Sequence, residues 1–216
     1  MDAVGYDRMG SRKKLKAPKA AERASKAERI DAAIAAAAVK HRDNLAVRAV
    51  GLLSDASDQP PLLVASSVTL AAGLLLRRPR VARVGFRMLA SEAVATGMKA
   101  VIKRYVARTR PHKMLEDGRY QLHKDSKAQK NEGPWNSFPS GHTAGAVAVG
   151  RAFSREYPGA SGAAAALATA VGVVQLPKGT HFSSDVAAGA IVGLVAEAIV
   201  DQAMGAGAVI LRTRGA

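Results

Sequence analysis

The sequence predicts an all-α fold, a helical bundle of about five to six helices. No segment alternates apolar and polar residues with period two over a useful length, which argues against strands. Hydrophobic residues make up 48% of the 216 residues and are rich in alanine and valine. Small side chains let helix backbones approach closely, as they do in membrane bundles. We therefore expect the bundle to be embedded in a membrane, with a soluble alanine-rich bundle as the alternative.

The chain divides into a basic tail, one helical domain and a short C-terminal tail. Residues 1–29 carry nine Lys or Arg and almost no large apolar side chains, so we expect a flexible tail that can approach anionic headgroups. The helical domain is expected over 30–208, and 209–216 form the C-terminal tail. Residues 30–54 have a helical pattern but are too polar to span a bilayer, so we expect one or two helices against the core or in the interface. The charged or titratable positions of this segment are Lys40, His41, Arg42, Asp43 and Arg48.

Two further helices follow. Residues 60–76 contain no charge over 17 positions, which is the lower edge of the length that spans a membrane. Residues 81–106 read as one long helix. It contains Arg87, Glu92 and Lys99, which we expect to face the bundle interior, because a charge at the bilayer centre costs about 2.5–3.5 kcal/mol on insertion scales.

A polar loop at 107–139 separates these helices from three more, expected at 143–156, 160–177 and 184–208. About five crossings place this loop, the connector at 176–183 and the basic tail on one side of the membrane. The basic tail favours the cytoplasm by the positive-inside rule. The rule does not decide the orientation here, because a phosphate-binding site is also rich in basic residues. The side of the membrane that the site faces is therefore not predicted.

Charge and composition restrict the partners. Lys and Arg total 32 against 17 Asp and Glu, and the pI is about 10.6, which indicates an anionic partner such as a phosphorylated substrate, an anionic membrane or nucleic acid. Aromatic residues are only 4%, and no nucleic-acid-binding signature occurs, so no nucleic-acid partner is expected. The chain has no cysteine, which excludes disulfides, thiolate nucleophiles and Cys-bound metals.

The first of three chemical clusters is "KRYVARTRP". Lys103 and Arg110 are seven residues apart, close to two helical turns, and Pro111 disfavours helix at the residue before it. We therefore expect Arg110 just past the helix end, with both cations aimed at one point. Taken alone, a basic run beside a membrane explains the same residues.

The second cluster, "FPSGH", sets a tight turn before a helix. Ser140 offers a hydroxyl and Gly141 an unshielded N–H, at the positive end of the helix, which together make an anion cradle. His142 would lie beside the bound anion. A histidine that only caps its own helix is the alternative.

The third cluster, "HFSSD", contains a second histidine. The i, i+4 spacing of His181 and Asp185 favours a hydrogen bond from Nδ1–H to the carboxylate, which would leave Nε2 free to attack. Such pairs often only satisfy each other. No convincing third metal ligand accompanies the two histidines, and the surrounding cations repel a metal, so we expect neither a metal nor a cofactor.

The three clusters occur in the order Lys-x6-Arg-Pro, Pro-Ser-Gly-His and His-x3-Asp. This order resembles the type 2 phosphatidic acid phosphatase superfamily, also called PAP2 or lipid phosphate phosphatases, over about 30–208. The motif residues are Lys103, Arg110, Pro111, Pro139, Ser140, Gly141, His142, His181 and Asp185. One position departs from the pattern: Gln175 stands where the third motif usually has a phosphate-binding arginine. Gln175 retains an amide donor without a charge, and Lys178 is a possible substitute.

The resemblance implies a metal-independent phosphatase. A phosphate group would bind Lys103, Arg110, Ser140, Gly141 and Gln175. His181, oriented by Asp185, would become a phosphohistidine, and His142 would protonate the leaving oxygen. The expected substrates are lipid phosphates, phosphatidate-like or polyprenyl phosphates or diphosphates, and the expected location is a bacterial inner membrane.

Four alternatives remain from the sequence. A soluble acid phosphatase of the same superfamily and a vanadium-dependent haloperoxidase share the pocket. Loss of the motif arginine at Gln175 permits a weakened or non-catalytic relative. A basic membrane or nucleic-acid binder without enzymatic activity is the fourth. The oligomeric state is not predicted.

Overall fold

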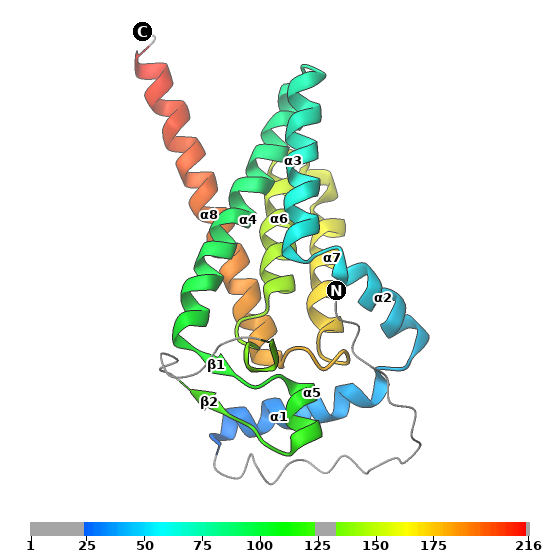
Figure 1. Cartoon of the computed structure of the whole chain (residues 1–216). Helices are drawn as coiled ribbons and strands as arrows, with labels where there is room; N and C mark the ends of the chain where they lie inside the picture. Colours follow the sequence, from blue (N-terminus) through cyan, green and yellow to red (C-terminus); the bar gives the residue numbers. More distant parts are fainter. Residues whose placement is uncertain (1–23, 124–132, 215–216) are drawn as a thin grey trace.

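The computed structural model describes residues 24–123 and 133–214 of the chain. This part contains eight α-helices and one pair of two-residue antiparallel strands (Figure 1). The elements are α1 Lys26–Ala38, α2 Leu45–Asp55, α3 Gln59–Leu75, α4 Pro79–Tyr105, β1 Ala107–Arg108, α5 Pro111–Asp117, β2 Leu122–His123, α6 Gly141–Glu156, α7 Ser161–Val174 and α8 Ser183–Arg214. The predicted all-α fold is confirmed. The helix count is somewhat higher than five to six.

Five long helices form the bundle. Helix α4 packs against α3, α6 and α8, and α6 packs against α7 and α8. Helices α1 and α5 and the strand pair lie across one end, which we call the site end (Figure 1). Because consecutive long helices run in alternating directions, the loop before α6 and the connector before α8 meet at this end.

Small residues allow the close packing that the composition predicts. A Cβ added at Gly189 or Gly193 of α8 would lie 2.5 Å from a backbone oxygen of α6, at Ser140 and Ala144 respectively. Helices α3 and α4 approach similarly at Gly85. Backbone contact of this kind is typical of helices that associate through van der Waals packing.

Two predicted boundaries fall inside helices. Helix α1 begins at Lys26 because Ser25 and Glu28 form a capping box, so the tail expected over 1–29 includes its first turn. Helix α8 continues to Arg214, beyond the expected start of the C-terminal tail at 209. Residues 1–23 and 215–216 lie outside the described part of the chain.

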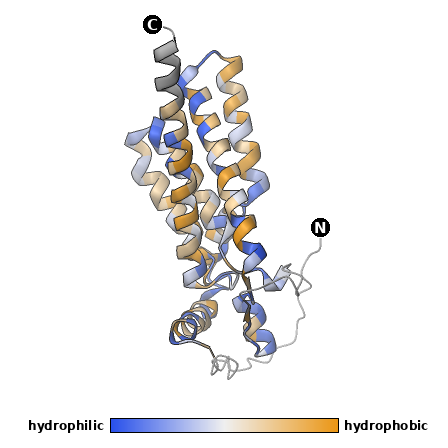
Figure 2. Cartoon of the chain, turned by 90° about the vertical axis from the view of Figure 1, so that its left-hand side faces the viewer, coloured by the Kyte–Doolittle hydropathy of each residue, from blue (hydrophilic) through white to orange (hydrophobic). Residues whose placement is uncertain are grey.

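Large apolar side chains are exposed on the outside of the bundle, among them Val68, Leu75, Leu167 and Ile191. Figure 2 shows hydrophobic residues along the length of the bundle helices. In the described part of the chain, one helix is long and apolar enough to cross a membrane, at Ser183–Ala206. Helix α3 and residues 158–174 are apolar but shorter.

Several charges inside the long helices are paired across the bundle. Arg87 of α4 contacts Glu156 of α6 at 3.2 Å and Asp201 of α8 at 2.8 Å. Arg155 of α6 contacts the buried Glu197 of α8 at 2.8 Å. These ion pairs connect α4, α6 and α8, and they explain how helices with several charges pack in an apolar bundle.

Candidate active site

The structure brings the two motif histidines together. His142 is the second residue of α6, and His181 lies in the connector two residues before α8. Their ring centroids are 6.5 Å apart, with 64° between the ring planes. Residues 39 positions apart in the sequence therefore lie close together at the site end.

The two motif cations converge on the segment that precedes the Pro-Ser-Gly-His turn. The Nζ of Lys103, in the last turn of α4, donates to the carbonyl oxygen of Asn136 at 3.3 Å, and Nη2 of Arg110 donates to the same oxygen at 3.4 Å. Arg110 has extended backbone angles and directly precedes Pro111, the first residue of α5. The expectation that Arg110 stands past the helix end is therefore correct.

Ser140 is buried and caps α6. Its Oγ accepts hydrogen bonds from the hydroxyl of Thr143 at 2.9 Å and from the backbone N–H of Thr143 at 3.4 Å. A Cβ at the neighbouring Gly141 would lie 3.2 Å from Nζ of Lys99. The absence of a side chain at Gly141 thus makes room for a third cation beside the turn.

Lys99 is one site-end residue that the sequence analysis did not assign to the site. It stands one turn before Lys103 in α4, so both side chains project from one face of the helix. Its Nζ also donates to Oε1 of Gln59 at 3.4 Å. The i, i+4 spacing of the two lysines is the sequence signal that could have identified it.

His181 is almost fully buried, and its Nδ1 lies 2.7 Å from the carbonyl oxygen of Ser137. Because a carbonyl only accepts, this contact assigns the hydrogen to Nδ1 and leaves Nε2 without one. Burial first, and then the positive charges of Arg110 and Lys103, hold the pKa of His181 well below its usual 6.5. The ring is therefore neutral at physiological pH.

The predicted hydrogen bond from His181 to Asp185 is wrong. The Nδ1 of His181 is 3.9 Å from Oδ2 of Asp185 and is bonded to Ser137 instead. Asp185 accepts from Nη1 of Arg108 at 2.6 Å, from the backbone N–H of Phe182 at 2.8 Å and from the hydroxyl of Ser137. The carboxylate thus reaches His181 through Ser137, whose carbonyl holds the ring.

Gln175 does not offer a donor to the site, contrary to its predicted role in phosphate binding. It is fully buried, and its Nε2 donates to the carbonyl of Val171 at 3.1 Å and to Ser54 at 3.3 Å. Its Oε1 accepts from Thr180 at 2.8 Å. The nearby Lys178 is held by Asp55 of α2 at 2.6 Å. Gln175 and Lys178 therefore link the segment before α8 to α2.

Arg108 and Asp31 are two further residues that sequence reasoning missed. Arg108 is buried between Asp31 of α1 and Asp185 of α8, and it contacts a carboxylate oxygen of each. Arg108 lies inside the basic cluster of the first motif, but no pattern in the sequence connects it with α1, 77 positions earlier.

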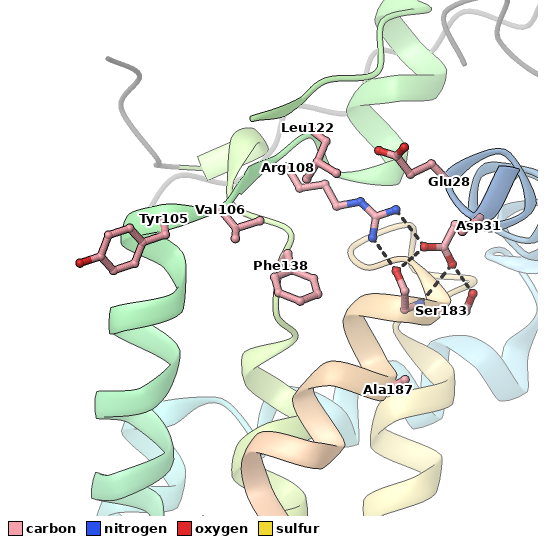
Figure 3. Close-up of a pocket in the computed structure, with 11 residues that line it drawn as sticks. Glu28, Asp31, Tyr105, Val106, Arg108, Leu122, Phe138, Ser183 and Ala187 are labelled. Atoms are coloured by element: carbon pink, nitrogen blue, oxygen red, sulfur yellow. Dashed lines mark hydrogen bonds and ion pairs between the residues drawn. The ribbon is translucent and has the colours of Figure 1, made fainter. Parts of the chain in front are cut away.

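A cavity of about 790 Å³ lies beside this pair (Figure 3). Its walls include apolar Val106, Phe138 and Ala187 together with Arg108 and Asp31. The motif histidines and Lys103 do not line it. Among the described residues, no group of three or more His, Asp and Glu is placed to hold a metal ion.

Two solved structures are similar to this chain. A transmembrane PAP2-type phosphatidylglycerolphosphate phosphatase from Bacillus subtilis is 22% identical and aligns over 85% of this chain and 89% of its own, with a TM-score of 0.60. LpxE from Aquifex aeolicus is 20% identical and aligns over 79% of this chain and 93% of its own, with a TM-score of 0.60. At these identities the likeness shows the fold.

No curated protein sequence matches the chain at a significant level. The family model of the PAP2 superfamily matches residues 82–206, which is more than half of the chain and includes all three motifs. The motifs, the fold and this match agree, and the chain therefore belongs to the PAP2 superfamily, as its motifs predict, and is a phosphatase of that superfamily.

Proposed function

We propose that this protein is a membrane-embedded phosphatase that hydrolyses a lipid phosphomonoester or pyrophosphate without a metal, through a phosphohistidine at His181. The observation that carries the proposal is the 6.5 Å separation of the His142 and His181 rings beside two converging cations, Lys103 and Arg110. Two imidazoles and two positive charges are what nucleophilic phosphoryl transfer needs when side chains supply the charge.

In the first step, Nε2 of His181 attacks phosphorus in line with the leaving oxygen. A P–N bond forms as the P–O bond breaks, and His142 donates a proton to the departing oxygen. Lys103 and Arg110 stabilise the negative charge on the equatorial oxygens, with Lys99 at the edge of the same group. In the second step, His142 takes a proton from water, the water oxygen attacks phosphorus, and the P–N bond breaks to release phosphate.

Three observations support a lipid substrate in a bacterial inner membrane. Large apolar side chains cover the outside of the bundle, and Ser183–Ala206 can span a bilayer. The site lies at one end of the bundle, where a headgroup at a membrane surface meets protein (Figure 1). The similar protein from Bacillus subtilis is described as a transmembrane phosphatidylglycerolphosphate phosphatase.

The test is phosphate release from a panel of phosphatidate, phosphatidylglycerolphosphate, polyprenyl phosphate and polyprenyl diphosphate, with a water-soluble phosphoester alongside. We expect release from at least one lipid, and a loss of about 10³-fold or more in His181→Ala. Radiolabelled phosphate should remain bound to the wild-type protein after a rapid alkaline quench and be absent from His181→Ala. Strong inhibition by EDTA would contradict the metal-free scheme. Turnover of the water-soluble ester alone would favour a soluble-type acid phosphatase.

The second candidate is a member of the superfamily with weakened activity, because the buried Gln175 stands in place of the motif arginine. If the missing arginine only weakens phosphate binding, Gln175→Arg should raise kcat/KM about ten- to a hundredfold. The contacts of Gln175 instead favour a lower kcat/KM in Gln175→Arg, because an arginine there would lose the contacts to Ser54, Val171 and Thr180. It would also approach Lys178, whose Nζ shares Ser54 with Gln175. Oxidation of bromide with added vanadate would instead favour the haloperoxidase alternative.

A further inference from the structure

Helix α1 sends one carboxylate into the site end. Asp31 is buried although it lies on a helix whose outer face is exposed. It accepts hydrogen bonds from Nη2 of Arg108 at 2.8 Å, from the backbone N–H of Ser184 at 3.1 Å, and from the hydroxyls of Ser183 and Ser184 (Figure 3). Asp31 thereby connects α1 to the start of α8.

Arg108 extends this connection to the motif residues. Its Nη1 donates to Oδ1 of Asp185 at 2.6 Å, and its Nε donates to the hydroxyl of Tyr120 at 3.1 Å. Its guanidinium carbon lies 4.1 Å from the centre of the Phe182 ring. The planar fork of an arginine can bond two carboxylates in fixed directions while it stacks on an aromatic ring, which a lysine cannot do.

The last two links reach the histidine. The Oδ2 of Asp185 accepts from the hydroxyl of Ser137, and the Ser137 carbonyl contacts Nδ1 of His181 at 2.7 Å. Each group in the sequence Asp31, Arg108, Asp185, Ser137 and His181 is held by the one before it. A displacement of Asp31 would therefore change the direction in which Nε2 of His181 points.

We propose that Asp31 and Arg108 are positioning residues that hold His181 in its reactive orientation, so that helix α1 is part of the catalytic apparatus. This inference rests on the proposed function for the role of His181. It adds a segment that the family motifs do not contain, because the PAP2 match begins at residue 82.

The electrostatics agree with a fixed connection. Burial alone would raise the pKa of Asp31, but hydrogen bonds from Ser183 and Ser184 and the charge of Arg108 outweigh it and leave that pKa below its usual value. The acid is therefore ionised when it binds the arginine. A buried carboxylate that keeps its charge is held by its partners, and loss of one partner leaves the other charge unpaired.

The decisive variant is Asp31→Asn, which keeps the shape and places an amide N–H against the N–H groups of Arg108. We expect kcat to fall about 10- to 100-fold through misalignment of the nucleophile, with KM within about twofold. Arg108→Lys should have a similar effect. The double variant should be no worse than the worse single one, because both changes break the same connection.

The matched control is Ala35→Gly on the same helix. Ala35 lies in the apolar cluster with Met114 and Phe182, its methyl group makes no hydrogen bond, and the change should cost about 1 kcal/mol through helix propensity. We expect a lower Tm with kcat within about twofold of wild type. If Ala35→Gly lowers kcat as much as Asp31→Asn, the role of Asp31 is only structural and the proposal is overturned.

A second readout does not depend on activity. In NMR spectra of ring-labelled histidine, assigned with His181→Ala, the His181 signal should report Nδ1–H in the wild type and should shift or broaden in Asp31→Asn. An unchanged signal together with unchanged kcat would overturn the positioning role. If the wild type releases no phosphate from any substrate, the proposed function fails, and the histidine signal still tests whether Asp31 holds His181.

Discussion

His181, the proposed nucleophile, is held neutral by its surroundings. The carbonyl of Ser137 holds Nδ1, burial removes water from the ring, and Arg110 and Lys103 repel a second proton. The same cations that would bind phosphate thus keep the proposed nucleophile unprotonated. One set of charges serves both purposes because all of these groups converge on a single turn.

The low pKa of His181 makes a prediction with a definite sign. Below pH 6.5 the unfolded chain binds a proton at this position that the folded protein does not, so folding stability falls as pH drops from 6.5 towards the folded pKa. In a histidine NMR titration in detergent, with His181→Ala to assign the signal, we expect the ring to stay neutral until well below pH 6.5. Titration at or above that value would contradict the geometry described for the site.

The sequence predicts the members of the site better than their contacts. The pairing of His142 with His181 follows from the motifs, because distant motifs that form one site must converge. The predicted bond from His181 to Asp185 assumed a helix through both residues, whereas α8 begins at Ser183 and His181 lies in the connector. Asp31 could not be predicted, because no local pattern indicates which helix meets Arg108.

At the level of elements, most of the fold follows from local signals. Helical patterns and turn residues predict the bounds of α3, α4, α6 and α7 to within about three residues, whereas α8 runs six residues beyond its expected end. The sequence does not predict the short helix α5, because Pro111 indicates the end of the preceding helix as well as the first turn of a new one, where proline is also favoured. The sequence does contain a signal for the start of α1, since Ser25 and Glu28 have the spacing of a capping box.

The packing of α8 on the start of α6 depends on Gly189 of α8. A Cβ at Gly189 would lie 2.5 Å from the carbonyl oxygen of Ser140, which cannot retreat without moving the cap of α6 and the nearby His142. We expect Gly189→Ala to destabilise the protein by about 1–3 kcal/mol. It should also lower kcat, and thermal unfolding and phosphate release on the same preparation measure both effects.

Gly205→Ala in the same helix is the control for this substitution. Nothing lies within 4 Å of a Cβ added at Gly205, so alanine there should be neutral or stabilise the helix by up to about 1 kcal/mol. Wild-type Tm and activity in Gly189→Ala would show that the two helices do not touch as described.

For the whole molecule, the arrangement of the charges says more about whether the bundle can cross a membrane than the composition does. Only Ser183–Ala206 passes as a membrane span by length and composition in the described chain, because α4 carries several charged residues and α3, α6 and α7 are shorter than a membrane span. Many of these charges face partners, as Arg87 faces Glu156 and Asp201. Paired charges inside a bundle are compatible with a membrane, although hydropathy alone cannot recognise them.

Five bundle helices running in alternating directions make a prediction about sidedness. Helices α1 and α5 lie at the site end, and the turn between α6 and α7 lies at the opposite end (Figure 1). The chain has no native cysteine, so single cysteines at exposed Arg29, Glu116 and Gly159 can report each end separately. In intact spheroplasts, an impermeant maleimide should either label both Arg29→Cys and Glu116→Cys but not Gly159→Cys, or label Gly159→Cys alone. All three should react after detergent is added. Equal labelling of all three in intact spheroplasts would mean that the bundle does not cross the membrane. If Arg29→Cys and Glu116→Cys react, the site faces outward, and if only Gly159→Cys reacts, the site faces the cytoplasm.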